Sequence, residues 1–248
     1  MSKSKPLKLT DQPKRIRDFI AYVREVCKKH NVELYLGQGS RIVYPDDTDS
    51  MARSANNAMG MGCFIEYDEG DEIAGRLMVA TKRPRWQWIG TLAHELSHEM
   101  QWLECEPTYT AGEMSDGNEA SAVVDDWIAF KEDFDKRTVR KALQITIDCE
   151  LDNEKRTVRM LRKFKLPVEE KRYIQSANSY LFFHQVVFEN RTWYNTKMFD
   201  PQVLNHMPDH FLPDASYKIG KMPREYVEYL EGIVINQNGW NWKTRKRS

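Results

Sequence analysis

The chain lacks the features of an exported or membrane protein. None of its apolar runs approaches the roughly 20 residues that a membrane-spanning helix needs, and residues 1–14 are basic and polar, without a signal-peptide core. Only four cysteines occur among 248 residues, and no two of them form a C-x-x-C pair. Because this usage is typical of reduced thiols, we expect no disulfide framework. Together these absences predict a cytoplasmic protein that does not bind membranes.

The chain also lacks an excess of charge of either sign. Lysine plus arginine and aspartate plus glutamate each number 37, so the net charge is zero and gives no support for a nucleic-acid partner. A hydrophobic content of 41% is ordinary for a folded protein, and a chain of this length can bury one core. We therefore expect a single domain over residues 1–248, with flexible tails at 1–10 and 243–248.

Histidine is scarce as well, but two of the six histidines fall in the motif His94-Glu95-Leu96-Ser97-His98. When H-E-x-x-H lies on a helix, its two imidazoles stand one turn apart with a carboxylate beside them, as a zinc hydrolase requires. The alternative is a solvated or packed histidine pair that binds no metal. Because Glu95 stands between the histidines, the pattern favours the metal, and we predict a Zn²⁺ site.

The motif lies within a predicted amphipathic helix at residues 85–103. Pro84 can open this helix, and Pro107 lies beyond its end. On a helical wheel, His94 and His98 project about 140° to 180° away from the apolar stripe, so we expect them to face a cleft. The stripe consists of Ile89, Leu92, Ala93, Leu96, Met100 and Leu103.

Two histidines leave the predicted zinc site incomplete, because a catalytic zinc usually takes three protein ligands. The metzincin extension H-E-x-x-H-x-x-G-x-x-H is excluded, since Gln101 replaces its glycine and Glu104 replaces its last histidine. The third ligand must therefore come from another segment of the chain.

A second predicted helix, at residues 138–166, offers that ligand. Its apolar stripe takes in Glu150 and Glu154, whereas Asp148 and Asp152 fall on the opposite side. A carboxylate on a buried face costs several kcal/mol unless a cation or hydrogen bonds compensate it. Buried arginines could do so, but the incomplete zinc motif favours one of the two acids as ligand, and Glu150 is our choice. The stripe otherwise consists of Leu143, Ile147, Leu151, Val158 and Leu161.

These two segments together carry a resemblance to a known family. H-E-x-x-H followed by a helix with E-x-x-x-[DE] resembles the gluzincin branch of the zincin metallopeptidases. The resemblance implies that Glu150 binds zinc and that Glu154 orients a zinc-bound histidine. Position 154 holds glutamate where the family more often has aspartate, so the order of the two acids stays open. Residues 150–167 also resemble uncharacterised metallopeptidase-like proteins of bacteriophages, for which the expected location is the host cytoplasm.

The expected fold class is α+β and zincin-like, with a small, mostly antiparallel sheet before the His94 helix and a largely helical C-terminal half. The resemblance implies that an edge strand holds the substrate backbone by strand addition, and either strand of a predicted hairpin fits this role. A helix beginning near Pro13 precedes the sheet, and residues 111–121 are predicted to form a loop. Strands are predicted at 32–36, 41–44, 63–67 and 75–81, the last two forming the hairpin.

A further predicted helix after Pro167 carries Tyr180 and His184 on its inward face. Gluzincin chemistry uses a tyrosine or histidine donor to stabilise the oxyanion, so these two residues are candidates for that catalytic role. The alternative is that both are core residues with hydrogen-bonded polar tips. The aromatic final third is expected either to wall the site or to cover the core.

We therefore predict a zinc-dependent metallopeptidase that hydrolyses peptide bonds in a protein or peptide substrate. Zinc held by His94, His98 and Glu150 would acidify a water molecule, and Glu95 would act as general base. The pattern specifies neither the cleavage preference nor the oligomeric state. Two alternatives are a zinc-stabilised binding protein without catalysis and a DNA-associated metalloprotease, and the neutral charge disfavours the second.

Overall fold

The structure is a computed structural model, and its residues form two compact units. The first unit comprises Met1–Glu104 and Arg156–Glu169, and the second comprises Cys105–Lys155 and Glu170–Ser248. No helix in the described part of the chain is both long and apolar enough to cross a membrane. The structure describes residues 9–42, 61–67, 70–112, 114, 119–192, 199–238, 240–241 and 246–247.

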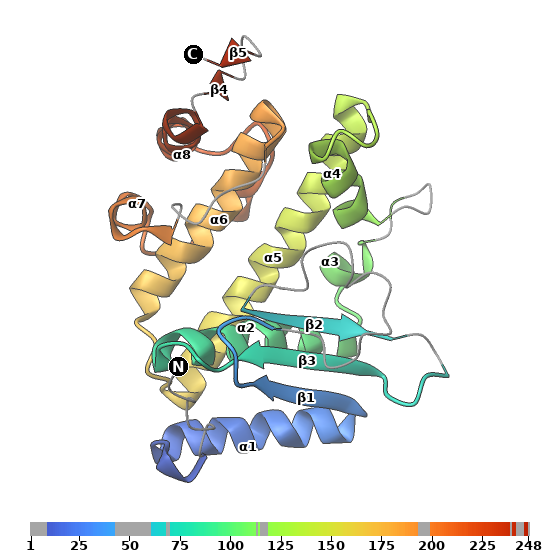
Figure 1. The fold of residues 1–248 in the computed structure, drawn as a ribbon, viewed down its shortest axis with the longest axis vertical. Coiled ribbons are helices and arrows are strands. Elements are labelled where there is room, and N and C mark those ends of the chain that lie inside the picture. The colour runs from blue at the N-terminus through green and yellow to red at the C-terminus, as the bar shows by residue number, and fades with distance from the viewer. Residues whose placement is uncertain are drawn as a thin grey trace. The chain divides into compact units, whose positions relative to one another are not determined.

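A three-stranded sheet with strand order β1-β3-β2 forms the centre of the first unit (Figure 1). The central strand β3 (Gly75–Ala80) pairs in parallel with β1 (Val32–Gly37) and antiparallel with β2 (Gly62–Glu66). The hairpin and the strand at 32–36 are therefore confirmed to within one residue. The sheet is mixed rather than mostly antiparallel, because β2 joins the edge far from β1 and β3 returns between them.

The strand predicted at 41–44 is not found in its described part. Arg41 and Ile42 lie outside any strand, and residues 43–44 are not among the described residues. Ile42 is instead fully buried in a small cluster with Met78 and Ala80. Its apolar character therefore reflects burial in the core and not strand pairing.

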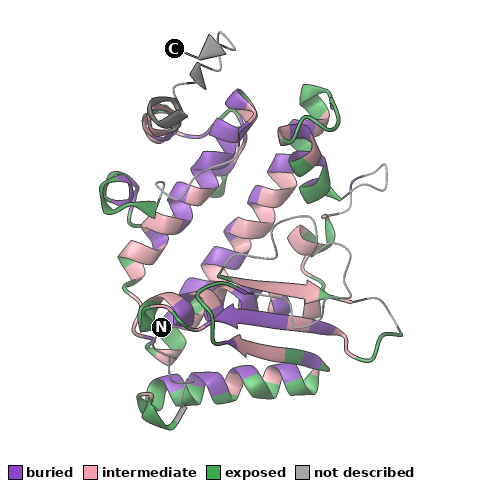
Figure 2. Ribbon diagram, in the orientation of Figure 1, coloured by how far each residue is buried: buried purple, intermediate pink, exposed green. Residues whose placement is uncertain are grey.

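Helices α1 (Lys14–Lys29) and α2 (Arg85–Leu103) pack on this sheet, α1 on β1 and α2 on β2 and β3 (Figure 1). The bounds of α2 match the prediction, although Pro84 is the cap residue and not the first helical residue. Figure 2 shows that α1 is buried on one side and exposed on the other, as its sequence pattern predicts. Its buried residues are Ile16, Phe19, Ile20, Val23 and Cys27.

Helix α2 is buried on more than the one apolar face that its sequence predicts. Most of the predicted stripe is fully buried, although Met100 and Leu103 are half-buried. Three polar residues, Ser97, Glu99 and Gln101, are also 0% exposed. Buried polar side chains require hydrogen-bond partners. These three polar positions of α2 therefore belong to the interior and not to a solvated face.

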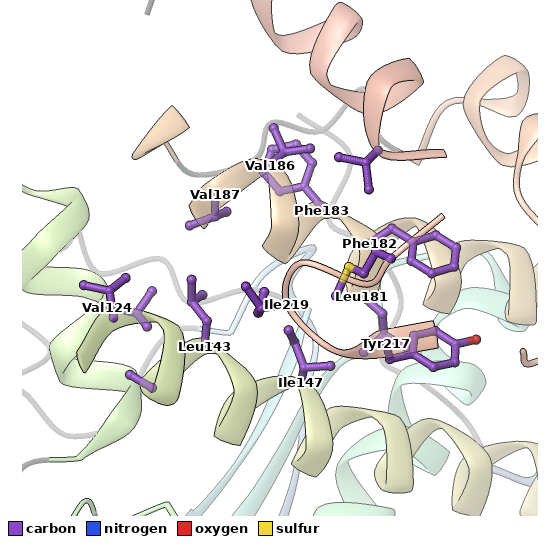
Figure 3. Close-up of a cluster of buried hydrophobic side chains, with 14 of the residues drawn as sticks. Val124, Leu143, Ile147, Leu181, Phe182, Phe183, Val186, Val187, Tyr217 and Ile219 are labelled. Carbon is purple, nitrogen blue, oxygen red and sulfur yellow. The ribbon is translucent and has the colours of Figure 1, made fainter. Parts of the chain in front are cut away.

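The second unit is largely helical, which confirms that part of the predicted fold class. Buried side chains of α5 (Lys136–Phe164) and α6 (Glu170–Asn190) face one another in its core, with Ile219 beside them (Figure 3). Residues 120 and 121 begin α4, so the predicted loop at 111–121 ends earlier than expected. The other elements after α2 are α3 (Pro107–Thr110), α4 (Ala120–Ile128), α7 (Pro201–His206), η3 (Asp214–Tyr217), α8 (Arg224–Asn238), β4 (Trp240–Asn241) and β5 (Lys246–Arg247).

The described part of the final third covers the core of this unit. Tyr217 is 0% exposed, and its ring stacks on Phe182 with the two centroids 5.4 Å apart. The hydroxyl of Tyr217 donates to Oδ1 of Asn178 and accepts the backbone N–H of Leu212. Met207 and Met222 are buried in the same cluster. Covering the core is therefore an observed role of this segment.

Candidate metal centre

The two histidines of the motif lie one turn apart on α2, as their spacing predicts. Their ring centroids are 4.9 Å apart, and the ring planes are nearly perpendicular at 86°. Both side chains are half-buried. One ring nitrogen of each lies within 4.8 Å of the other. The pair therefore has the placement that two ligands of one metal require.

Gln101 holds the ring of His98 in one orientation. Its side-chain oxygen lies 2.9 Å from Nδ1 of His98, and the glutamine is 0% exposed. An amide oxygen can only accept a hydrogen bond, so the proton belongs on Nδ1 and the lone pair is on Nε2. Burial and the neighbouring His94 lower the pKa of His98 to about 3, against which the Gln101 hydrogen bond acts. His98 is thus a neutral imidazole, the form that binds a metal.

Glu95 is buried, with 7% of its surface exposed, and it lies against strand β2. A Cβ atom built on Gly62 would lie 2.9 Å from both Cγ and Oε1 of Glu95. The next residue along the strand, Cys63, has its pKa raised to about 12 by burial and then by the charge of Glu95. In the predicted hairpin, β3 is the central strand and β2 is the edge strand. Glu95 therefore lies beside the edge strand.

The C-terminal part of α5 is attached to α2 inside the first unit. The hydroxyl of Thr157 donates to the hydroxyl of Ser97 over 3.1 Å, and Ser97 in turn donates to the backbone oxygen of Ala93. One residue earlier, Arg156 forms an ion pair with Glu104 at the end of α2. These contacts fix the rotation of α5 about its axis at the point where it meets α2.

Glu150 and Glu154 stand on the same face of α5 as Thr157, because the three follow the helical spacing i, i+4, i+7. Glu154 is 6% exposed, which confirms that this acid lies within the buried stripe, and Glu150 is half-buried. The rest of the predicted stripe is buried. Asp148, predicted on the solvent side, is itself 33% exposed and pairs with Lys218.

Among the described residues, one group could hold a metal ion, and it consists of His94, His98 and Glu150. One ligand atom from each lies within 4.8 Å of the others. Two imidazoles and one carboxylate are the donor set of many catalytic zinc sites, and the set leaves a coordination position for water. The residues present therefore fit zinc. Glu154 is not part of this group, so its predicted role behind the ligands stays a prediction.

Tyr180 and His184 both lie on α6 in the second unit. Their rings meet edge to face with centroids 4.8 Å apart, and Nδ1 of His184 donates to the backbone oxygen of Tyr180 over 3.0 Å. His184 is 2% exposed, and burial lowers its pKa to about 4. This is the packed, hydrogen-bonded arrangement considered as the alternative to catalysis. Neither residue belongs to the metal-binding group, and their role at the oxyanion stays a prediction.

Three residues of this site were not found by sequence reasoning. In the sequence, Gln101 was used only to exclude the metzincin pattern. Its i, i+3 spacing from His98 nevertheless places the two residues on one helix face, so their contact could have been predicted. Thr157 could also have been found, because its spacing places it on the helix face that carries Glu150 and Glu154. Gly62 could not have been found, because its contact with Glu95 depends on how a strand packs on a helix.

Comparison with known proteins gives no match to a protein-family model, to a curated protein or to a solved structure.

Proposed function

We propose that the chain is a zinc-dependent metallopeptidase of the zincin type. The observation that carries this proposal is the group of His94, His98 and Glu150, with the carboxylate of Glu95 on the same helix as the two histidines. A purely structural zinc site is usually closed by four protein ligands. Three ligands beside a buried carboxylate favour a site that performs hydrolysis.

Each residue has a defined task in this reaction. A zinc ion bound by the three ligands supplies Lewis acidity, which acidifies a water molecule and polarises the scissile carbonyl. Glu95 accepts a proton from that water while its oxygen adds to the carbonyl carbon. The same carboxyl group then gives the proton to the amide nitrogen as the C–N bond breaks. The products are a carboxylic acid and an amine, and Glu95 returns to its starting form.

Strand β2 supports an extended peptide as the substrate. Met61 and Tyr67, just outside the strand at its two ends, form backbone hydrogen bonds with Ala80 and Ala74 on the β3 side. By the alternation of an antiparallel ladder, Gly62 and Phe64 direct their N–H and C=O groups away from β3. These groups can pair with an added strand. A peptide bound in this way would run past Glu95.

The decisive test is the substitution Glu95→Gln. We expect it to abolish peptide hydrolysis and to leave zinc stoichiometry and folding intact, because Glu95 is a base and not a ligand. New protein N-termini, identified across the proteome after expression of each variant, report the activity, and elemental analysis reports the zinc. His94→Ala is the matched control and loses both zinc and activity. Equal cleavage by wild type and Glu95→Gln would rule out the proposed mechanism.

A further inference from the structure

Gly62, the first residue of β2, lies close to α2 at the site. A Cβ atom on this residue would lie 2.5 Å from Cγ2 of Thr91 and 2.9 Å from both Cγ and Oε1 of Glu95. All three separations are shorter than ordinary van der Waals contact. No side chain larger than hydrogen fits at position 62 unless both Thr91 and Glu95 give way.

The requirement for glycine here is one of space and not of backbone conformation. Among the described glycines, positive φ angles occur at Gly70 and Gly220, and Gly62 is not one of them. Other residues could therefore adopt the backbone dihedral angles of position 62. What alanine would change is the space that the Glu95 side chain occupies.

Of the two residues in contact, Glu95 has the side chain that can move further. Helix α2 is regular, and Thr91 is held by its hydroxyl bond to the backbone oxygen of Gln87. The end of a glutamate side chain can rotate at a much smaller cost than a helix can shift. The charge of Glu95 is also felt on β2, where it contributes to the raised pKa of Cys63. The geometry at Gly62 and this charge effect both show that the carboxylate lies close to the strand.

We propose that Gly62 is a positioning residue for the general base. Because this residue has no side chain, the Glu95 side chain packs close to the backbone of β2, and this packing holds the carboxylate in position. The inference rests on the proposed function. It also deepens it, because the N–H and C=O groups of Gly62 point away from β3. The residue that seats the base is therefore also one that can hydrogen-bond an added peptide strand, which places the peptide backbone next to the base.

Gly62→Ala tests this assignment. We expect kcat to fall by roughly 100-fold, because a displacement of about 1 Å at a catalytic group has an effect of this size. The zinc Kd should be unchanged, since no metal ligand is touched. Gly37→Ala is the matched control: it lies on the opposite edge strand, where its Cβ would meet Tyr35 at 3.0 Å and neither Glu95 nor Thr91. Full activity is expected for this control.

The double variant Gly62→Ala/Thr91→Ser keeps the test valid if the single variant folds poorly. Serine lacks the Cγ2 atom, so this variant relieves the contact at residue 91 and keeps the one at Glu95. We expect it to recover thermal stability but not kcat. Recovery of kcat together with stability would overturn the proposal, because Gly62 would then serve packing alone. Activity of Gly62→Ala equal to that of wild type would overturn it as well.

A second measurement needs no activity and separates this inference from the proposed function. If the contact is direct, Gly62→Ala lowers Tm less in a Glu95→Ala background than in wild type, because the displaced atoms are already absent. Equal drops in Tm in both backgrounds would overturn the seating of Glu95 on Gly62. Absence of hydrolysis by the zinc-loaded wild-type protein would instead contradict the proposed function, whatever the result of this cycle.

Discussion

Gln101 shows how one buried amide can select the metal-binding nitrogen of a histidine. A neutral imidazole exists in two tautomers, and the acceptor at 2.9 Å favours the one protonated at Nδ1. This tautomer places the lone pair on Nε2. Such partners behind metal-binding histidines commonly have a large effect on affinity.

Replacing Gln101 with leucine is therefore expected to weaken zinc binding by roughly 10-fold to 100-fold. Gln101→Glu should preserve affinity, because a carboxylate also accepts the Nδ1 proton. The zinc Kd from competition with a chelator checks both, and imidazole ¹⁵N shifts of the metal-free protein report the tautomer of His98. Gln87→Leu on the same helix serves as control. If Gln101→Leu binds zinc as tightly as wild type, Gln101 has no orienting role.

His184 gives the second unit a predictable response to acid. Its pKa in the folded protein is about 4, whereas an unfolded histidine titrates near 6.5. Between these two values the unfolded chain takes up a proton that the folded chain does not. The free energy of unfolding should therefore decrease as the pH falls from 6.5 towards 4, by about 3 kcal/mol in total.

The comparison of wild type with His184→Asn measures this contribution. The asparagine amide keeps a donor near the position of Nδ1 for the backbone oxygen of Tyr180, but it does not titrate. Urea unfolding at several values between about pH 4 and 7 should show a flatter curve for the variant. Other titrating groups, such as Glu99, are common to both proteins and cancel in the difference. Parallel curves would contradict the buried neutral state of His184.

At the scale of elements, α5 carries both of the acids proposed to act at the metal site. Glu150 joins His94 and His98 in the candidate group, whereas Glu154 is the more deeply buried of the two acids. We expect Glu150→Ala to release zinc and Glu154→Ala to weaken binding by roughly 10-fold to 100-fold without abolishing it. A zinc titration of the two variants decides between them. Loss of zinc from Glu154→Ala alone would reverse the two roles.

Helices and the hairpin were predictable because their signals are local. Pro84 and a periodic apolar stripe predicted the bounds of α2, and the acidic, glycine-containing stretch at residues 68–72 between two apolar segments predicted the hairpin. The parallel pairing of β1 with β3 was not predictable, because it depends on where β2 enters the sheet. Within the site, the motif and the acids of α5 were found by spacing. Gly62 was missed because a glycine has no side chain whose pattern could be read.

For the whole molecule, zinc should act as a stabilising ligand of the folded state. A ligand at about 1,000 times its Kd adds about 4.1 kcal/mol to the free energy of unfolding. For a chain of this size that corresponds to an increase in Tm of roughly 8–16 °C. Differential scanning calorimetry with zinc and with excess chelator measures the shift. The His94→Ala/His98→Ala variant should show none, and an equal shift in that variant would show that zinc binds elsewhere.

The division of the chain also has a consequence for its synthesis on the ribosome. The first unit is discontinuous, since it needs Arg156–Glu169 in addition to the residues up to Glu104. The segment that carries Thr157, the partner of Ser97, therefore emerges only after the whole intervening stretch has been translated. At about 5–20 residues per second this is a delay on the order of several seconds. During that interval the helix with the two histidines belongs to an incomplete unit, and the candidate group of His94, His98 and Glu150 can form only when α5 has been made.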